Sequence, residues 1–152
     1  MRILGVDFGA RRIGLAVADA EARVAVPVGA IDRAGVGDAC DVVAEAARAR
    51  GADAVVVGLP VLMSGAAGAQ AKEAREFAAL LAERAGLAVH TWDERLSSVE
   101  AERRLREAGG RRKPKPGEQD AMAAALVLQA YLDANRDLCA PPLSPHPPPP
   151  RR

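Results

Sequence analysis

The sequence predicts an α/β protein in which a mixed β-sheet is flanked by helices. Short apolar runs typical of strands are followed, later in the chain, by stretches in which apolar residues recur at helical spacing. The first three runs follow one another without a helix between them, which favours a meander that leads into right-handed β-α-β crossovers. With 152 residues, the chain can form one domain and bury a core without disulfides or a structural metal.

Three strands are predicted in the first third of the chain. Residues Arg2–Val6 form a buried apolar run that we expect to end at Asp7 and the turn Phe8–Ala10. Arg12–Val17 is the expected hairpin partner, and Arg23–Ile31 supplies a third extended segment. This part of the chain therefore predicts the meander.

Helices and strands alternate in the rest of the predicted domain. The elements are, in order, a helix over Asp38–Arg50, a strand over Ala54–Val57, a helix that includes Ala74, Phe77, Ala78, Leu81 and Ala85, a strand over Leu87–Trp92, a helix from Ser97 to Ala108 and a last helix over Glu118–Asn135. Gly51 and Gly86 end the first two helices, and Ser97 with Glu100 forms a capping box at the start of the third. We expect residues 1–138 to be one domain, and the Pro-rich residues 139–152 to be a disordered tail.

The composition excludes several classes of protein. No stretch approaches the roughly 18–20 apolar residues of a membrane span, and the N-terminal apolar run is too short for a signal sequence. We therefore expect a soluble, cytoplasmic protein without membrane contacts. Cys40, Cys139, His90 and His146 are too far apart in sequence for a zinc-binding pattern, so the cysteines are expected to be reduced and structural.

Basic residues are concentrated between positions 103 and 115. This segment holds seven of the 21 Lys and Arg residues and one acid, Glu107, so its net charge is +6 while the rest of the chain sums to −5. The seven are Arg103, Arg104, Arg106, Arg111, Arg112, Lys113 and Lys115. Such a cluster is typical of a polyanion-binding surface, although a solvated helix end and loop would give the same pattern.

Acidic residues at three points of the predicted fold suggest a metal site. Asp7 closes the first strand, Asp93 and Glu94 follow the last strand, and Asp120 lies in the first turn of the final helix. Sites in open α/β sheets gather at the carboxyl ends of the strands, so Asp7 and Glu94 could meet there if their strands are close neighbours. Converging carboxylates can hold two Mg²⁺ or Mn²⁺ ions, which would activate water and stabilise the leaving oxygen in phosphodiester hydrolysis.

Each acid also has a structural interpretation. Asp7 could be a turn residue, Asp93 and Glu94 could belong to a surface loop paired with Arg95, and Asp120 could complement a helix N-terminus. An acid at the end of a buried strand is costly without a partner. Taken together, and with no other candidate nucleophile in the chain, the three points favour the metal site.

Four segments of the chain form a recognisable set of motifs: GVDFGARRIGLAVAD at 5–19, VGLPVLMSG at 57–65, WDERLSSVEAER at 92–103 and DAMAAALVLQ at 120–129. Together they resemble the YqgF-type family, whose members are described as pre-16S rRNA nucleases and as Holliday-junction-resolvase-like proteins. They occur in the family's order and span nearly all of residues 1–135. The chain departs from the family at Leu62 and Ser64, where Asn and Asp are common, at Gln119, which is usually apolar, and at Ser98, which is more often Thr.

The resemblance implies an RNase H-like fold with the strand order 3-2-1-4-5. It carries the family's acidic, metal-binding and catalytic site to Asp7, Glu94 and Asp120, with Asp93 as an accessory acid. It also makes Arg12 a phosphate contact and matches Arg95 to the arginine that follows the family's acidic pair.

The leading functional hypothesis is a divalent-metal nuclease that trims the 5′ end of precursor 16S rRNA, alone or on ribosomal precursor particles. Arg11, Arg12 and the basic segment 103–115 would hold the phosphate backbone. A Holliday-junction resolvase acting on branched DNA as a homodimer remains an open alternative. So do a nucleotide-binding module, because Asp7-Phe8-Gly9 resembles the first phosphate loop of actin-like ATPases, and a non-catalytic interaction protein.

Overall fold

The computed structural model describes residues 1–9, 11–19, 21–32, 36–59, 68–93 and 118–135. The strands are β1 (Arg2–Phe8), β2 (Arg12–Asp19), β3 (Val24–Asp32), β4 (Ala54–Leu59) and β5 (Ala88–Asp93). The helices are α1 (Val36–Ala49), α2 (Ala69–Ala85) and α4 (Glu118–Ala134). The helix expected from Ser97 to Ala108 and the Pro-rich tail lie outside the described residues.

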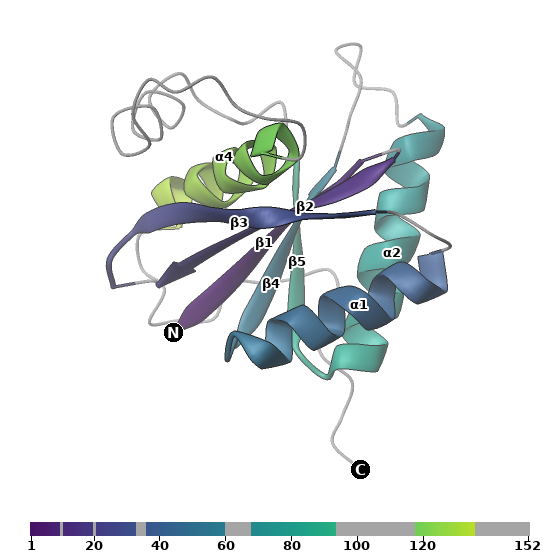
Figure 1. Ribbon diagram of the computed structural model, residues 1–152, viewed down its shortest axis with the longest axis horizontal. Helices are drawn as coiled ribbons and strands as arrows, with labels where there is room; N and C mark the ends of the chain where they lie inside the picture. Colours follow the sequence, from purple (N-terminus) through teal and green to yellow (C-terminus); the bar gives the residue numbers. More distant parts are fainter. Residues whose placement is uncertain (10, 20, 33–35, 60–67, 94–117, 136–152) are drawn as a thin grey trace.

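The five strands form one mixed sheet in the order β3-β2-β1-β4-β5 (Figure 1). β1 pairs antiparallel with β2, which pairs antiparallel with β3, whereas β1–β4 and β4–β5 are parallel pairs. The mixed sheet and its strand order confirm the prediction. The parallel pairing also brings the carboxyl ends of β1, β4 and β5 to one edge of the sheet.

Helices cover both faces of the sheet, α1 and α2 on one face and α4 on the other (Figure 1). Alternate residues of β1 point to the two sides: Leu4, Val6 and Phe8 belong to the core under α1 and α2, and Ile3 belongs to the core under α4. We call these the α1/α2 face and the α4 face. On the α1/α2 face, Phe8 stacks on Phe77 of α2 with the ring centroids 4.5 Å apart.

Two glycines allow α4 to lie directly on the central strands. A Cβ at Gly5 of β1 would lie 2.8 Å from the Leu128 Cβ, and a Cβ at Gly14 of β2 would collide with the backbone carbonyl of Asp120. Both contacts are closer than side chains normally approach each other. The α4 face therefore depends on the absence of side chains at these two strand positions.

The structure corrects the predicted end of the first strand. β1 continues through Asp7 to Phe8, since Phe8 is buried and pairs with Ile13. The turn begins at Gly9, whose N–H lies 3.1 Å from the carbonyl oxygens of Asp7 and Arg12. The prediction that Asp7 ends the strand was wrong, and Asp7 is held inside the sheet instead.

Other boundaries shift by a few residues. Arg23 has a left-handed φ of 57° and belongs to the β2–β3 turn, so β3 begins one residue later than expected. α1 begins at Val36 and buries Cys40, Val43 and Ala47, whereas Val42 is 47% exposed. The expected end of α2 is confirmed, because Gly86 adopts a left-handed conformation there.

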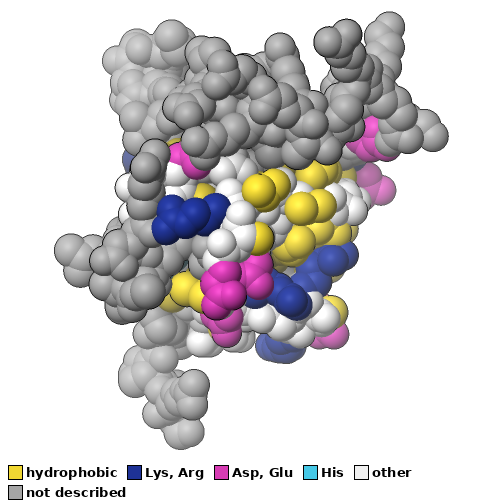
Figure 2. Space-filling model, turned by 90° about the vertical axis from the view of Figure 1, so that its left-hand side faces the viewer, with side chains coloured by type: hydrophobic (Ala, Val, Ile, Leu, Met, Phe, Trp, Pro, Cys, Tyr) yellow, Lys and Arg dark blue, Asp and Glu magenta, His cyan; other side chains and the backbone are white. Residues whose placement is uncertain are grey.

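The side of the molecule that carries the β2–β3 hairpin is chemically mixed. Figure 2 shows hydrophobic side chains among acidic and basic ones on this side. Val24 and Val26 of β3, the edge strand, are 44% and 53% exposed. None of the helices in the described ranges is long and apolar enough to cross a membrane.

Candidate functional site

Asp7 lies on the α4 face, at the carboxyl end of the central strand. Strand alternation gives it the side of the sheet occupied by Ile3 and Gly5. Its pairing partners are Gly14 in β2 and Gly58 in β4, so no side chain flanks it on either neighbouring strand. The Asp7 side chain is half-buried at this edge of the sheet.

Asp120 reaches the same place from the other end of the sequence. It is the third residue of α4, and its backbone carbonyl lies on Gly14, the strand partner of Asp7. Neighbouring strands are about 4.8 Å apart, so Asp7 and Asp120 occupy adjacent positions on the α4 face. The structure thus brings together two of the three predicted catalytic acids, which are 113 residues apart in the sequence.

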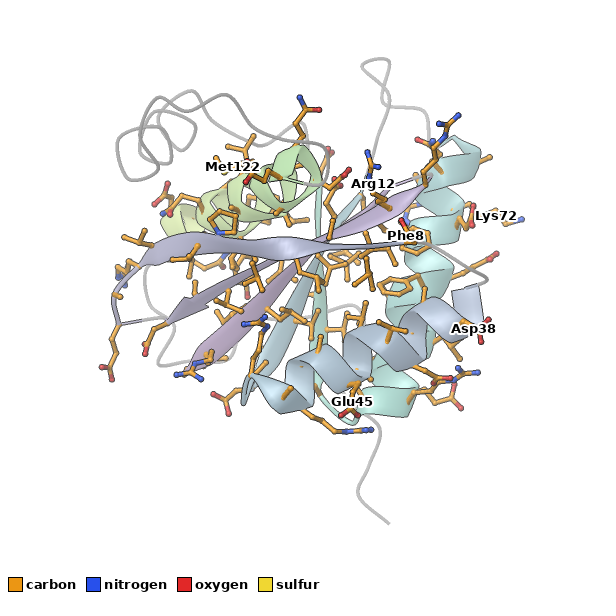
Figure 3. All side chains as sticks on the ribbon, viewed as in Figure 1. Phe8, Arg12, Asp38, Glu45, Lys72 and Met122 are labelled. Carbon is orange, nitrogen blue, oxygen red and sulfur yellow. The ribbon has the colours of Figure 1, made fainter. Side chains whose placement is uncertain are left out.

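Arg12 pairs with Asp120 at this position. The Arg12 Nε donates a hydrogen bond to the Asp120 Oδ2 at 2.8 Å, with the two side chains 44% and 25% exposed. Arg12 begins β2 and lies two residues before Gly14, so it shares the α4 face (Figure 3). Arg11, the preceding residue, is exposed.

Asp93 lies at the same edge of the sheet but on the opposite face. It pairs with Leu59 of β4, which belongs to the core on the α1/α2 face, and residues paired in register point to the same side. Its neighbour Trp92 points to the α4 face, where it packs against Tyr131. The structure therefore does not place the Asp93 side chain beside those of Asp7 and Asp120.

Three aromatic side chains pack against one another on the α4 face. The ring of Tyr131 lies 5.7 Å from that of His90 and 5.8 Å from that of Trp92, between centroids. Burial lowers the pKa of His90 and raises the pKa of Tyr131 to about 12. Within the described ranges, the His90 Nδ1 and the Trp92 Nε1 have no hydrogen-bond partner. Trp92 is partly buried and packs against the core on the α4 face.

Several predicted residues cannot be placed. Glu94, Arg95, Leu62, Ser64, Ser98 and the basic residues of segment 103–115 lie outside the described residues. In the part of the chain that is described, no three His, Cys, Asp or Glu side chains form a group that could hold a metal ion. Asp7 and Asp120 still provide the carboxylate oxygens that Mg²⁺ and Mn²⁺ prefer, so the donor chemistry fits a hard divalent cation.

Sequence reasoning missed Gly14 as part of the site. Its role depends on the contact with Asp120, which only the fold reveals. One signal was present, since Gly5 and Gly14 stand on two predicted strands that otherwise carry larger apolar residues, and glycine within a strand often marks a close approach of another backbone.

Comparison with known proteins gives consistent matches. Residues 1–134 match the family model described as "RuvX: Holliday junction resolvase". A "Putative pre-16S rRNA nuclease" of Anaeromyxobacter dehalogenans (strain 2CP-C) is 47% identical over 133 residues, which cover 88% of this chain and 97% of that protein. A protein of the same name from Chloroflexus aurantiacus (strain J-10-fl) is 41% identical, with 88% of each chain covered.

Solved structures show the same fold. RuvC from Thermus thermophilus superposes with a TM-score of 0.65 at 20% identity, covering 90% of this chain and 96% of that one. A second structure, titled as T. thermophilus RuvC in complex with Holliday junction substrate, matches with the same TM-score and identity. These similarities confirm the RNase H-like fold that the sequence predicts.

Proposed function

The chain belongs to the RuvX family, and from this membership we propose that it is a metal-dependent nuclease that processes the 5′ end of precursor 16S rRNA. Relatives that are 41–47% identical over most of the chain carry the name pre-16S rRNA nuclease, qualified as putative. The observation that carries the proposal is the position of Asp7 and Asp120, which Gly14 allows to lie side by side at the carboxyl edge of β1. The proposal places this hydrolysis in the cytoplasm, on free RNA or on ribosomal precursor particles.

We assign the metal-binding role to Asp7, Asp120 and Glu94. Asp7 and Asp120 supply carboxylates from the sheet and from the first turn of α4. Glu94 follows Asp93 directly in the sequence and is the acid that the family resemblance assigns to this site. Mg²⁺ or Mn²⁺ bound there, as one ion or two, would supply an activated water and stabilise the leaving oxygen. Arg95 is accessory in this proposal, and Asp93, on the opposite face of the sheet, is given no role at the site.

Basic side chains would bind the phosphates of the substrate. Arg11 and Arg12 are exposed at the start of β2, next to the site, and segment 103–115 provides seven further cations. Such contacts reach phosphates and carry little sequence information. Trp92 packs edge-on against Tyr131 on the α4 face, which supports recognition by backbone shape rather than by base stacking.

A second candidate is the resolution of four-way DNA junctions. The description of the family model favours it, because that description reads Holliday junction resolvase. The same carboxylates would serve both reactions, but a two-fold symmetric junction requires two sites in a symmetric homodimer. Substrate choice and oligomeric state therefore separate the two functions.

The test is a side-by-side cleavage assay on a precursor 16S rRNA leader and a synthetic four-way junction, with Mg²⁺ or Mn²⁺. Asp7→Asn and Glu94→Gln should both lose activity. The matched control is Asp38→Asn, which changes an exposed acid in the first turn of α1, on the opposite face. Preferential cutting of the leader supports the rRNA function, and preferential cutting of the junction by a dimer supports the resolvase. Cleavage that survives Asp7→Asn would contradict the site, and folded wild-type protein that cuts neither substrate would favour a binding function.

A further inference from the structure

The Arg12–Asp120 ion pair occupies an atom that the proposed metal site also needs. The Arg12 Nε donates to the Oδ2 of Asp120 at 2.8 Å. The same carboxylate is one of the proposed cation ligands. A guanidinium and a divalent cation on one carboxylate repel each other, so pairing with Arg12 and binding of a cation compete at Asp120.

We propose that Arg12 is an exchangeable partner of Asp120. The Arg12 guanidinium pairs with the Asp120 carboxylate until a divalent cation binds there, and it then turns to a phosphate of the nucleic acid. The inference rests on the proposed function, because it needs the cation at Asp120. It gives Arg12 a positioning role toward the metal site in addition to its expected phosphate contact.

The geometry allows such an exchange. The backbone of Asp120 packs against Gly14, so Asp120 stays at this position on the sheet when the partner of its carboxylate changes. The Arg12 side chain is 44% exposed and stands at the start of β2, where it can turn toward solvent. Arginine carries five N–H donors in a planar fork that matches phosphate as well as carboxylate. Since the pair is partly exposed, breaking it costs little.

The exchange couples cation binding to nucleic-acid binding. A cation on Asp120 frees the Arg12 guanidinium for a phosphate, and a phosphate that holds Arg12 frees Asp120 for the cation. Such coupling is reciprocal by thermodynamic necessity, so each ligand should tighten the binding of the other. Removal of Arg12 should abolish this part of the coupling.

The first experiment measures Mn²⁺ binding to the full chain without nucleic acid, by calorimetry and by the electron paramagnetic resonance signal of free Mn²⁺. Arg12→Ala should bind Mn²⁺ about three- to ten-fold more tightly than wild type, because a competing cation is gone. Arg11→Ala removes an equal charge one residue away and should change the affinity by less than about two-fold. Arg12→Lys, which keeps the charge but loses the guanidinium, should lie between wild type and Arg12→Ala.

The second experiment measures binding of a labelled RNA leader with and without Ca²⁺, which takes the same oxygen ligands, while a gel confirms that the RNA stays intact. In wild type, Ca²⁺ should tighten RNA binding about three-fold or more, and in Arg12→Ala this gain should be lost. An equal gain in both proteins would contradict the exchange.

Different results would contradict the metal site and the exchange of partners at Asp120. If Asp120→Asn and Asp7→Asn bind Mn²⁺ as well as wild type, the metal site itself is wrong. If both lose Mn²⁺ binding while Arg12→Ala binds Mn²⁺ with unchanged or weaker affinity, the metal site stands and the exchange is overturned.

Discussion

Helices α1 and α4 begin alike but lie on opposite faces of the same sheet. Each carries an acid as its third residue, Asp38 in α1 and Asp120 in α4. Asp38 is exposed (Figure 3), whereas the side chain of Asp120 is 25% exposed and paired with Arg12. The difference comes from the strands beneath the two helices. Bulky side chains such as that of Phe8 fill the α1/α2 face, whereas on the α4 face the missing side chain of Gly14 lets the start of α4 approach the sheet closely.

This comparison shows that an acidic residue in the first turn of a helix does not by itself indicate a functional site. An acid in the first turn of a helix stabilises any helix by interacting with its dipole. It becomes a candidate ligand only where the fold places a second acid beside it. Here that placement depends on Gly14, which lies between the backbone of Asp120 and the strand of Asp7.

The largest expected effect comes from exchanging the two helix-start acids for amides. Asp120→Asn should lower the rate of metal-dependent cleavage by about 100-fold or more, since metal-bound charge stabilisation is worth several kcal/mol. Asp38→Asn should leave the rate within about two-fold of wild type. Initial rates at saturating Mg²⁺ would measure both, with circular dichroism to confirm folding. Equal losses in the two variants would remove the distinction between the faces.

The next effect tests the close approach of α4. Gly14→Ala places a Cβ against the Asp120 carbonyl and should reduce the free energy of unfolding by about 3 kcal/mol, at the upper end of typical overpacking costs. Gly29→Ala is the control, because a Cβ there meets no atom within 4 Å, and it should change stability by about 0.5 kcal/mol or less. Urea unfolding would measure both. If Gly14→Ala were as stable and as active as wild type, α4 would not need the glycine.

A third variant tests what fixes the far end of α4. Gln129 is buried; its Oε1 accepts from the Ala25 N–H, and its Nε2 donates to the Arg23 carbonyl, both at 3.0 Å. Gln129→Leu keeps the volume but leaves these two backbone groups unpaired, so it should cost about 2 kcal/mol of unfolding free energy. Gln119→Leu, on an exposed position of the same helix, should cost less than about 0.5 kcal/mol. Chemical denaturation of both variants would decide, and equal stabilities would contradict this role of Gln129.

Most strands and helices could be predicted from the spacing of apolar residues in the sequence. Apolar runs and helical spacing located every described strand and helix to within a few residues, and the family resemblance supplied the strand order. The end of β1 was misjudged because Asp7 and Gly9 look like the start of a turn, while the burial of Phe8 that extends the strand depends on Phe77, far away in the sequence.

The site was predicted in part. Asp7, Asp120 and Arg12 were identified, and the structure places them together. The face of Asp93 could not be predicted, because it depends on the register between β4 and β5, and a shift of one residue would reverse it. The ion pair of Arg12 with Asp120 was not foreseen either, since it joins residues that only the close packing of α4 brings into contact.

The smallest effects concern the pH dependence of the free energy of unfolding. A buried group on the α4 face should lower it at acid pH, and one on the α1/α2 face should lower it at alkaline pH. His90, on the α4 face, is buried, and burial lowers its pKa below the ordinary 6.5. Below pH 6.5 the unfolded chain therefore binds a proton that folded His90 does not bind, so the free energy of unfolding should fall as the pH falls. The slope is at most about 1.4 kcal/mol per pH unit. His90→Phe should remove this loss.

Cys40, on the buried side of α1, should affect stability at alkaline pH. Burial raises the pKa of its thiol from 9.0 to about 11, so above pH 9 the unfolded chain loses a proton that the folded protein retains. The free energy of unfolding should then fall as the pH rises from 9, and Cys40→Ala should reduce that fall. The window from pH 9 to 10 is the most informative because Tyr131, whose pKa is raised from 10.0 to about 12, adds a loss of the same sign mainly above it. If Cys40→Ala had no effect there while His90→Phe flattened the acid limb, only the α4 face would carry a buried group whose protonation is linked to folding.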